Sequence, residues 1–140
     1  MTPLADAARA YLGVPFRHRG RGRTLDCAGL VVRACADVGY PMQDQKHYGR
    51  EPVNDGLVEA AIRSFGEPVH VSPVRLSDLR PDDILLIRYD IHPHHAMIVG
   101  EAPYGGLTVI HADGHMGRVI EHRIDDKLAA DITHVFRRPV

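Results

Sequence analysis

The sequence predicts an α+β fold in which N-terminal helices pack on a five-stranded antiparallel sheet. Apolar residues recur at helical spacing in the first half, whereas the second half holds short β-branched segments separated by turn residues. These segments follow one another without helical patterns between them, and such close spacing favours antiparallel pairing. We expect residues 1–140 to form one domain, because the length suits one domain and no repeat or linker interrupts it.

The composition is that of an ordinary globular protein and argues against several classes of function. Hydrophobic residues make up 44% and charged residues 25%, and the formal net charge of -1 gives no basis for nucleic-acid binding. No apolar run approaches the roughly 18 residues of a membrane span, so no membrane partner is expected. The first residues lack the basic start and apolar core of a signal peptide, so we expect the chain to begin in the cytoplasm.

Two of the three predicted helices are defined by their end signals. In the first, Thr2 is the cap, Pro3 takes the first helical position, and Gly13 ends the helix. The other spans residues 54–65 and ends at Gly66. The apolar stripes consist of Leu4, Ala7, Ala8 and Tyr11 in the first helix and of Leu57, Ala61, Ile62 and Phe65 in the other.

Between them, the segment RTLDCAGLVVRACADVG (23–39) predicts a helix that carries both cysteines of the chain. Asp26 is its N-cap and Gly39 ends it. Cys27 and Cys35 would lie about 12 Å apart along this helix, and a disulfide needs Cα atoms within about 7 Å. The cysteines therefore cannot pair, and Cys35, in mid-helix, is predicted to be a core residue. The inward face consists of Cys27, Leu30, Val31, Ala34, Cys35 and Val38.

Cys27 has a different environment, because it lies in the first turn of this helix. Unpaired backbone N–H groups and the positive end of the helix dipole meet there, and they stabilise a thiolate or a developing oxyanion. On the local sequence two hypotheses stay open: Cys27 is a nucleophile, or it is a core residue. A nucleophilic thiol needs a base, usually a histidine oriented by a third polar group.

Histidines of the second half lie at the ends of two neighbouring predicted strands. His94 and His95 precede the strand 96–100, and His111 lies near the end of the strand 107–112. Adjacent antiparallel strands bring the start of one beside the end of the next, so one of the pair is expected to neighbour His111. The five predicted strands are 83–89, 96–100, 107–112, 118–124 and 133–139.

Four sequence blocks occur in an order typical of one known family. They are YLGVPFRHRGRGRTLDCAGLVV (11–32), RPDDILLIRY (80–89), HHAMIVG (94–100) and VIHADG (109–114). Together they resemble the NlpC/P60 cysteine peptidases, which are papain-like peptidoglycan hydrolases, and the resemblance covers about residues 11–140. It implies a papain-like fold and a cysteine-type hydrolase of amide bonds in peptidoglycan stem peptides, with no cofactor or metal expected.

The resemblance also implies which residues form the catalytic triad. Cys27 matches the nucleophile, and His111 matches the third residue, which orients the base. The glycine of the family's histidine motif lies six residues after its histidine, and six residues before Gly100 is His94. We therefore favour His94 over His95 as the base, with His95 facing the other side of the strand as a structural or exposed residue.

Beside the nucleophile, the same resemblance implies an oxyanion and substrate-binding set of Asp26, Phe16, His18 and Arg17. The family often has tyrosine near the position of Phe16, which lacks a hydroxyl, so His18 is a candidate donor; a loop-packing role for His18 stays open. Arg17 lies in the basic loop RHRGRGR (17–23), where arginines are candidates for binding stem-peptide carboxylates. A solvated basic loop is the alternative.

The ending THVFRRP (133–139) and the absent signal peptide resemble the phage-tail and prophage members. Other phage tail proteins are therefore expected partners, and the phage virion is an expected location. Two alternatives stay open: a non-catalytic tail assembly module, and a zinc-binding protein that uses the histidine cluster and Cys27. Asp82 replaces the usual glycine of one family block and is expected to change only a turn. Segment 40–52 is either part of a substrate groove or a connecting loop.

Overall fold

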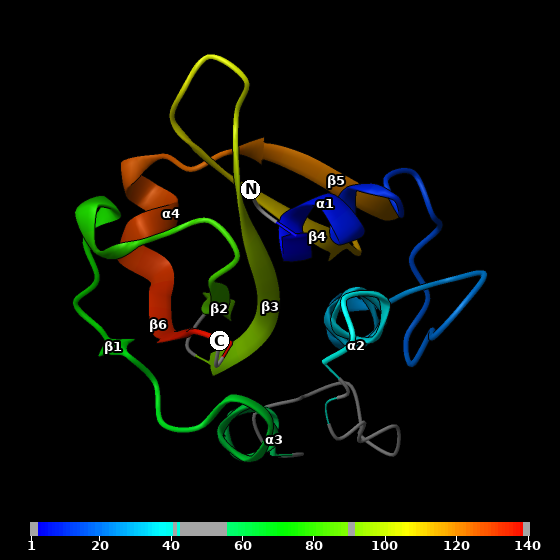
Figure 1. Cartoon of the computed structure of the whole chain (residues 1–140), viewed down its shortest axis with the longest axis horizontal. Helices are drawn as coiled ribbons and strands as arrows, with labels where there is room; N and C mark the ends of the chain where they lie inside the picture. The colour runs from blue at the N-terminus through cyan, green and yellow to red at the C-terminus, as the bar shows by residue number, and fades with distance from the viewer. Residues whose placement is uncertain (1–2, 41, 43–55, 90–91, 139–140) are drawn as a thin grey trace.

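The computed structural model describes residues 3–40, 42, 56–89 and 92–138 (Figure 1). Thr2 and most of segment 40–52 lie outside these residues, so the predictions made for them stay predictions. The elements are, in chain order, α1 (Pro3–Arg9), α2 (Cys27–Asp37), α3 (Leu57–Phe65), β1 (His70–Val71), the 3-10 turn η2 (Leu76–Asp78), β2 (Ile84–Tyr89), β3 (His92–Glu101), β4 (Leu107–Asp113), β5 (Arg118–Arg123), α4 (Asp126–Asp131) and β6 (Ile132–Phe136).

The sheet of the described residues has six strands in the order β1-β6-β2-β3-β4-β5, and all its pairs are antiparallel. The predicted class of helices and antiparallel sheet is therefore confirmed, but the prediction of five strands is corrected. The additional strand, β1, has two residues, which is too short to show an alternating pattern. The strands β2 to β5 pair in sequence order, as in a meander. The last strand, β6, departs from this order, because it pairs with β2 and not with β5.

Both faces of the sheet are covered by apolar residues. Along β2, Ile84 and Leu86 belong to the core shared with α1 and α2, whereas Leu85 and Ile87 belong to the core that includes Ala129 of α4. Figure 1 shows α1 and α2 on one side of β3 and α4 on the other. Burial on both faces explains why the central strands are nearly continuous apolar runs.

The first helix is shorter than its sequence pattern suggests. α1 ends at Arg9, whereas the prediction extended it to Gly13. The Tyr11 backbone N–H donates to the Ala8 carbonyl oxygen at 3.0 Å, which is the tighter spacing of a 3-10 turn. The Gly13 N–H then donates to the Val119 carbonyl oxygen at 3.0 Å, so the chain has already turned toward β5.

The second helix agrees with its prediction. α2 begins at Cys27, and Asp26 is its N-cap. Cys35 is fully buried, and both cysteines are free thiols, so the predicted core role of Cys35 and the absence of a disulfide between the two are confirmed. α3 begins at Leu57, three residues after the predicted start, and ends before Gly66 as expected.

Asp82 has a structural role that its sequence did not reveal. Its φ is 74°, in the left-handed region that favours glycine. Its carboxylate accepts hydrogen bonds from the backbone N–H groups of Ala5 at 2.8 Å and Leu4 at 3.2 Å. Asp82 therefore caps the start of α1 from the turn before β2, which is more than the predicted change of a turn.

Candidate active site

The start of α2 is fixed by Asp26, which is buried. Asp26 Oδ1 accepts hydrogen bonds from the Gly29 backbone N–H at 2.7 Å and from Arg21 Nη1 at 3.0 Å. Its Oδ2 accepts a third from the Arg19 backbone N–H at 2.9 Å. These are the contacts of an N-cap that also fastens the preceding loop. In the structure, Asp26 fixes the start of α2 and thereby the position of Cys27. The predicted substrate-binding role of Asp26 stays a prediction.

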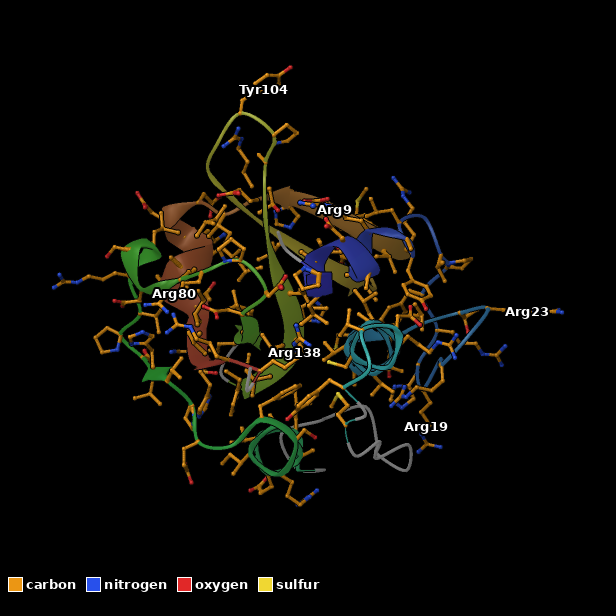
Figure 2. The ribbon with its side chains drawn as sticks, viewed as in Figure 1. Arg9, Arg19, Arg23, Arg80, Tyr104 and Arg138 are labelled. Atoms are coloured by element: carbon orange, nitrogen blue, oxygen red, sulfur yellow. The ribbon has the colours of Figure 1, made fainter. Side chains whose placement is uncertain are left out.

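The loop before α2 approaches the helix very closely. A Cβ added to Gly29 would stand 2.0 Å from the Gly20 carbonyl oxygen, so only glycine permits this packing. Arg17, Arg19 and Arg23 are exposed in the same loop, and Figure 2 shows Arg19 and Arg23 directed away from the body of the molecule. Exposed guanidinium groups here can meet an anionic ligand, as the sequence predicted for Arg17.

The Cys27 side chain is partly exposed at the first position of α2. Burial of the sulfur and, to a smaller extent, the negative charge of Asp26 raise the pKa of the Cys27 thiol to about 11. Hydrogen bonds from the backbone of Ala96 and of Ala28 act in the opposite direction on this pKa. The thiol is therefore protonated at neutral pH and needs a base. The contact with Ala96 places the thiol against the face of β3 that carries Ala96 and Ile98. His95 precedes Ala96 and lies on the opposite face.

Three histidines from neighbouring strands form a continuous hydrogen-bonded chain. His95 of β3 and His111 of β4 are buried, and His95 Nε2 lies 2.8 Å from His111 Nδ1. His111 Nε2 lies 2.9 Å from Nε2 of His122, which is exposed on β5. His122 Nδ1 in turn lies 3.0 Å from the carbonyl oxygen of Arg123. The expected neighbour of His111 is therefore found, and it is His95.

His111 is held in its neutral form by its surroundings. Burial and, to a smaller extent, the neighbouring His122 lower the pKa of His111 to about 4, although Asp113 partly opposes the shift. A neutral imidazole has one donor and one acceptor nitrogen. His111 can therefore accept a hydrogen bond from one histidine while it donates to the other. Because His95 and His111 lie on the sheet face opposite α2, the catalytic role predicted for His111 stays a prediction.

His94, the predicted base, lies in β3, but its side chain is outside the described part of the structure. The pairing of β2 with β3 shifts here: Ile87 is opposite His95, and Arg88 is opposite Pro93. His94 is the additional residue of this β-bulge, and a bulge interrupts the regular alternation of side chains along a strand. The role of His94 as base therefore stays a prediction.

The two remaining predicted residues lie in the loop between α1 and α2. Phe16 is partly buried against the core, and a Cβ added to Gly114 would be 3.6 Å from its ring. The Phe16 backbone N–H donates to the Gly117 carbonyl oxygen at 2.9 Å. Phe16 thus packs on the β4–β5 turn, as a ring without a hydroxyl can. His18 is partly buried, and its proposed donor role stays a prediction.

His122 is the site residue that the sequence analysis left without a role. Its signal was present, because His111 and His122 fall on one face of two paired strands; the register places His122 opposite Val109, two residues from His111.

Within the described residues, no three His, Cys, Asp or Glu side chains are grouped so that they could hold a metal ion. None of the described helices has the length and apolarity needed to cross a bilayer.

Comparison with known proteins identifies the fold. No family model and no curated protein matches the sequence. Among solved structures, an NlpC/P60 family protein from Bacillus cereus has a TM-score of 0.65 at 15% identity, over 96% of this chain and 39% of that chain. NlpC1 from Trichomonas vaginalis has a TM-score of 0.67 at 18% identity, over 96% of this chain and 42% of that chain. This chain therefore spans less than half the length of these two proteins.

A third solved structure matches over nearly its whole length. The NlpC/p60 domain of the peptidoglycan hydrolase SagA has a TM-score of 0.57 at 18% identity, over 96% of this chain and 95% of that domain. At such identities the likeness defines the fold, so the chain has an NlpC/P60 fold, with mixed helices and an antiparallel sheet. The resemblance of the sequence blocks and the likeness of the fold thus point to the same group of proteins.

Proposed function

We propose that this chain hydrolyses amide bonds in peptidoglycan stem peptides, with Cys27 as the nucleophile. The observation that carries the proposal is the position of the thiol at the start of α2, where the backbone of Ala96 donates a hydrogen bond to it, and Ala96 directly follows His94 and His95 in β3. The NlpC/P60 fold and the naming of SagA as a peptidoglycan hydrolase support this class of substrate. A protonated thiol needs a neutral imidazole within reach as its general base.

The reaction follows from these groups. The imidazole base accepts the proton of the Cys27 thiol, and the sulfur attacks the carbonyl carbon of the scissile amide. Backbone N–H groups at the start of α2 stabilise the oxyanion of the tetrahedral intermediate. The imidazolium then gives its proton to the leaving amine, and a thioester remains on Cys27. Water, deprotonated by the same imidazole, attacks the thioester and releases the carboxylate product.

Motif spacing favours His94 as the base. The strand register argues against His95, because His95 and His111 lie on the sheet face of Met97 and Val109, and α2 covers the opposite face. The two hypotheses differ in a simple test: His95→Gln and His94→Gln are compared for the rate of Cys27 alkylation and for peptidoglycan cleavage. Loss of both activities in the His95 variant alone supports His95. Loss in the His94 variant alone identifies His94, and the hydrogen bond between His95 and His111 then has a structural role.

The proposed function is tested by mass spectrometry of muropeptides incubated with the protein. Wild type is expected to cleave stem peptides, Cys27→Ala to be inactive, and Cys35→Ala, the matched control in the same helix, to remain active. The new termini in the products identify the bond that is cut. An unchanged product pattern in Cys27→Ala would exclude a cysteine-type hydrolase.

Association with a phage tail belongs to this proposal and is supported by the sequence resemblance of the segment 133–139. Its test is co-purification with tail particles.

The two alternative functions, an assembly module and a zinc-binding protein, predict different experimental results. A non-catalytic assembly module would bind tail proteins equally well with Cys27→Ala and would cleave no muropeptide. A zinc protein would contain stoichiometric zinc after purification and would lose it when the histidines are replaced.

A further inference from the structure

The basic loop before α2 holds its arginines on a backbone of fixed shape. The Arg17 N–H donates to the Leu25 carbonyl oxygen at 3.2 Å, and the Gly20 N–H donates to the Arg17 carbonyl oxygen at 2.9 Å. The buried carboxylate of Asp26 accepts a hydrogen bond from the Arg19 N–H at 2.9 Å. A ligand of these side chains therefore does not have to order the loop backbone when it binds.

Three arginines of the basic loop are exposed: Arg17, Arg19 and Arg23. Figure 2 shows Arg19 and Arg23 directed outward, away from α2. The φ of Arg19 is 65°, in the left-handed region that favours glycine. An arginine at this position carries backbone strain that glycine would avoid, so the shape of the loop does not explain the side chain.

The positive charge of the basic loop is not neutralised by its acidic neighbour. Asp26 is buried and binds the fourth arginine, Arg21, at 3.0 Å. Within the part of the chain that the structure describes, no carboxylate forms an ion pair with Arg17 or Arg23. Because the formal net charge of the whole chain is -1, the loop is a local excess of positive charge on a nearly neutral protein. Such an excess attracts anions, and salt weakens the attraction.

We propose that the basic loop is a docking site for an anionic polymer of the cell wall, in which negative groups repeat along the strand. The proposal rests on the proposed function, because a protein that cleaves stem peptides acts on the wall. It differs from the predicted role of Arg17, because the outward direction of Arg19 and Arg23 places this contact away from the Cys27 helix. A guanidinium group forms paired hydrogen bonds with carboxylates and with phosphates. Stem-peptide carboxylates and wall phosphodiesters are therefore the two sources of this chemistry.

A nucleic acid also carries repeating phosphates and is the competing ligand. Much of the affinity for single strands comes from bases that stack on aromatic rings. The basic loop contains no Phe, Tyr or Trp, and Phe16, which precedes it, packs on the β4–β5 turn. We therefore favour the wall polymer, and binding to DNA is an outcome of the test.

Co-sedimentation with purified sacculi measures docking without cleavage when every protein carries Cys27→Ala. The test variant is Arg19→Gln/Arg23→Gln, which removes two charges, and Arg19→Lys/Arg23→Lys keeps them. The matched control is Arg75→Gln/Arg80→Gln, because these two arginines are also exposed. Figure 2 shows Arg80 on the other side of the molecule.

We expect the dissociation constant for sacculi to rise on the order of tenfold in the glutamine variant of the basic loop. The lysine variant and the control should bind as the unsubstituted loop does, and added salt should weaken this binding. Equal binding by the glutamine variant and the control, or binding that does not depend on salt, overturns the proposal. Tighter binding to a DNA duplex than to sacculi overturns it in favour of a nucleic acid.

Two treatments of the sacculi distinguish the sources of negative charge. Hydrofluoric acid removes wall phosphodiesters, and carbodiimide with ammonia converts carboxylates into amides. Loss of binding after either treatment supports the proposal and identifies that group as the partner, whereas unchanged binding after both overturns it. Muropeptide cleavage tests the proposed function separately. Salt-dependent docking by a protein that cleaves no muropeptide supports the docking site and overturns the proposed function.

Discussion

Acidification is expected to destabilise the folded protein through His111. The pKa of this buried imidazole is lowered from 6.5 to about 4, chiefly by burial. Because the folded pKa lies below the unfolded one, the unfolded chain binds the proton first. The stabilisation is therefore complete above a pH of about 6.5 and is lost as the pH falls through about 4. A separation of about 2.5 pKa units corresponds to about 3 kcal/mol of free energy of unfolding.

The assay is urea unfolding of wild type and His111→Gln between pH values of about 7 and 4. Glutamine does not titrate, yet its amide can still donate and accept. The pKa values of Asp83, His134 and Glu121 are also shifted, but both proteins contain these groups. Their contributions to the pH dependence of the unfolding free energy therefore cancel when the two proteins are compared. Wild type should lose about 3 kcal/mol more than the variant over this range. Equal losses, or an NMR titration of His111 near its ordinary pKa of about 6.5, would refute the reasoning.

Three further predictions concern the helix starts. Asp26→Asn should lower the pKa of Cys27 below about 11, because a negative charge beside the thiol is removed, and the pH dependence of alkylation measures this shift. Gly29→Ala should cost about 3 kcal/mol or more in thermal unfolding, because its Cβ meets the Gly20 carbonyl oxygen at 2.0 Å; a variant as stable as wild type contradicts this packing. Asp82→Ala should cost about 1 to 2 kcal/mol by losing the α1 cap, and Asp82→Gly should cost less because it relieves the positive φ, as chemical denaturation can compare.

The helix that carries Cys27 could be predicted because its signals are local. An N-cap, an apolar stripe and a terminal glycine all lie within residues 23–39, and the hydrogen bonds of a helix join residues four positions apart. The same locality explains why Cys35 was recognised as a core residue. Asp82 shows the limit of local signals, because its carboxylate binds Leu4 and Ala5 from the other end of the chain.

The histidine chain could be predicted only in part. Strand order along the sequence was enough to expect one of His94 and His95 beside His111. The register between β3 and β4 places His95 on the same sheet face as His111, and a register between strands has no clear mark in the sequence pattern. His122 stayed without a role because its contribution depends on the register between β4 and β5.

By itself, the sequence determined the class of fold, the start of the helix at Cys27 and the free state of both thiols, because periodicity and capping are properties of short segments. Only the tertiary structure decided the sixth strand, the cap that Asp82 gives to α1 and the hydrogen-bonded chain from His95 to His122. Each of these depends on which residues distant in sequence become neighbours, and that follows from strand register and packing of the whole chain.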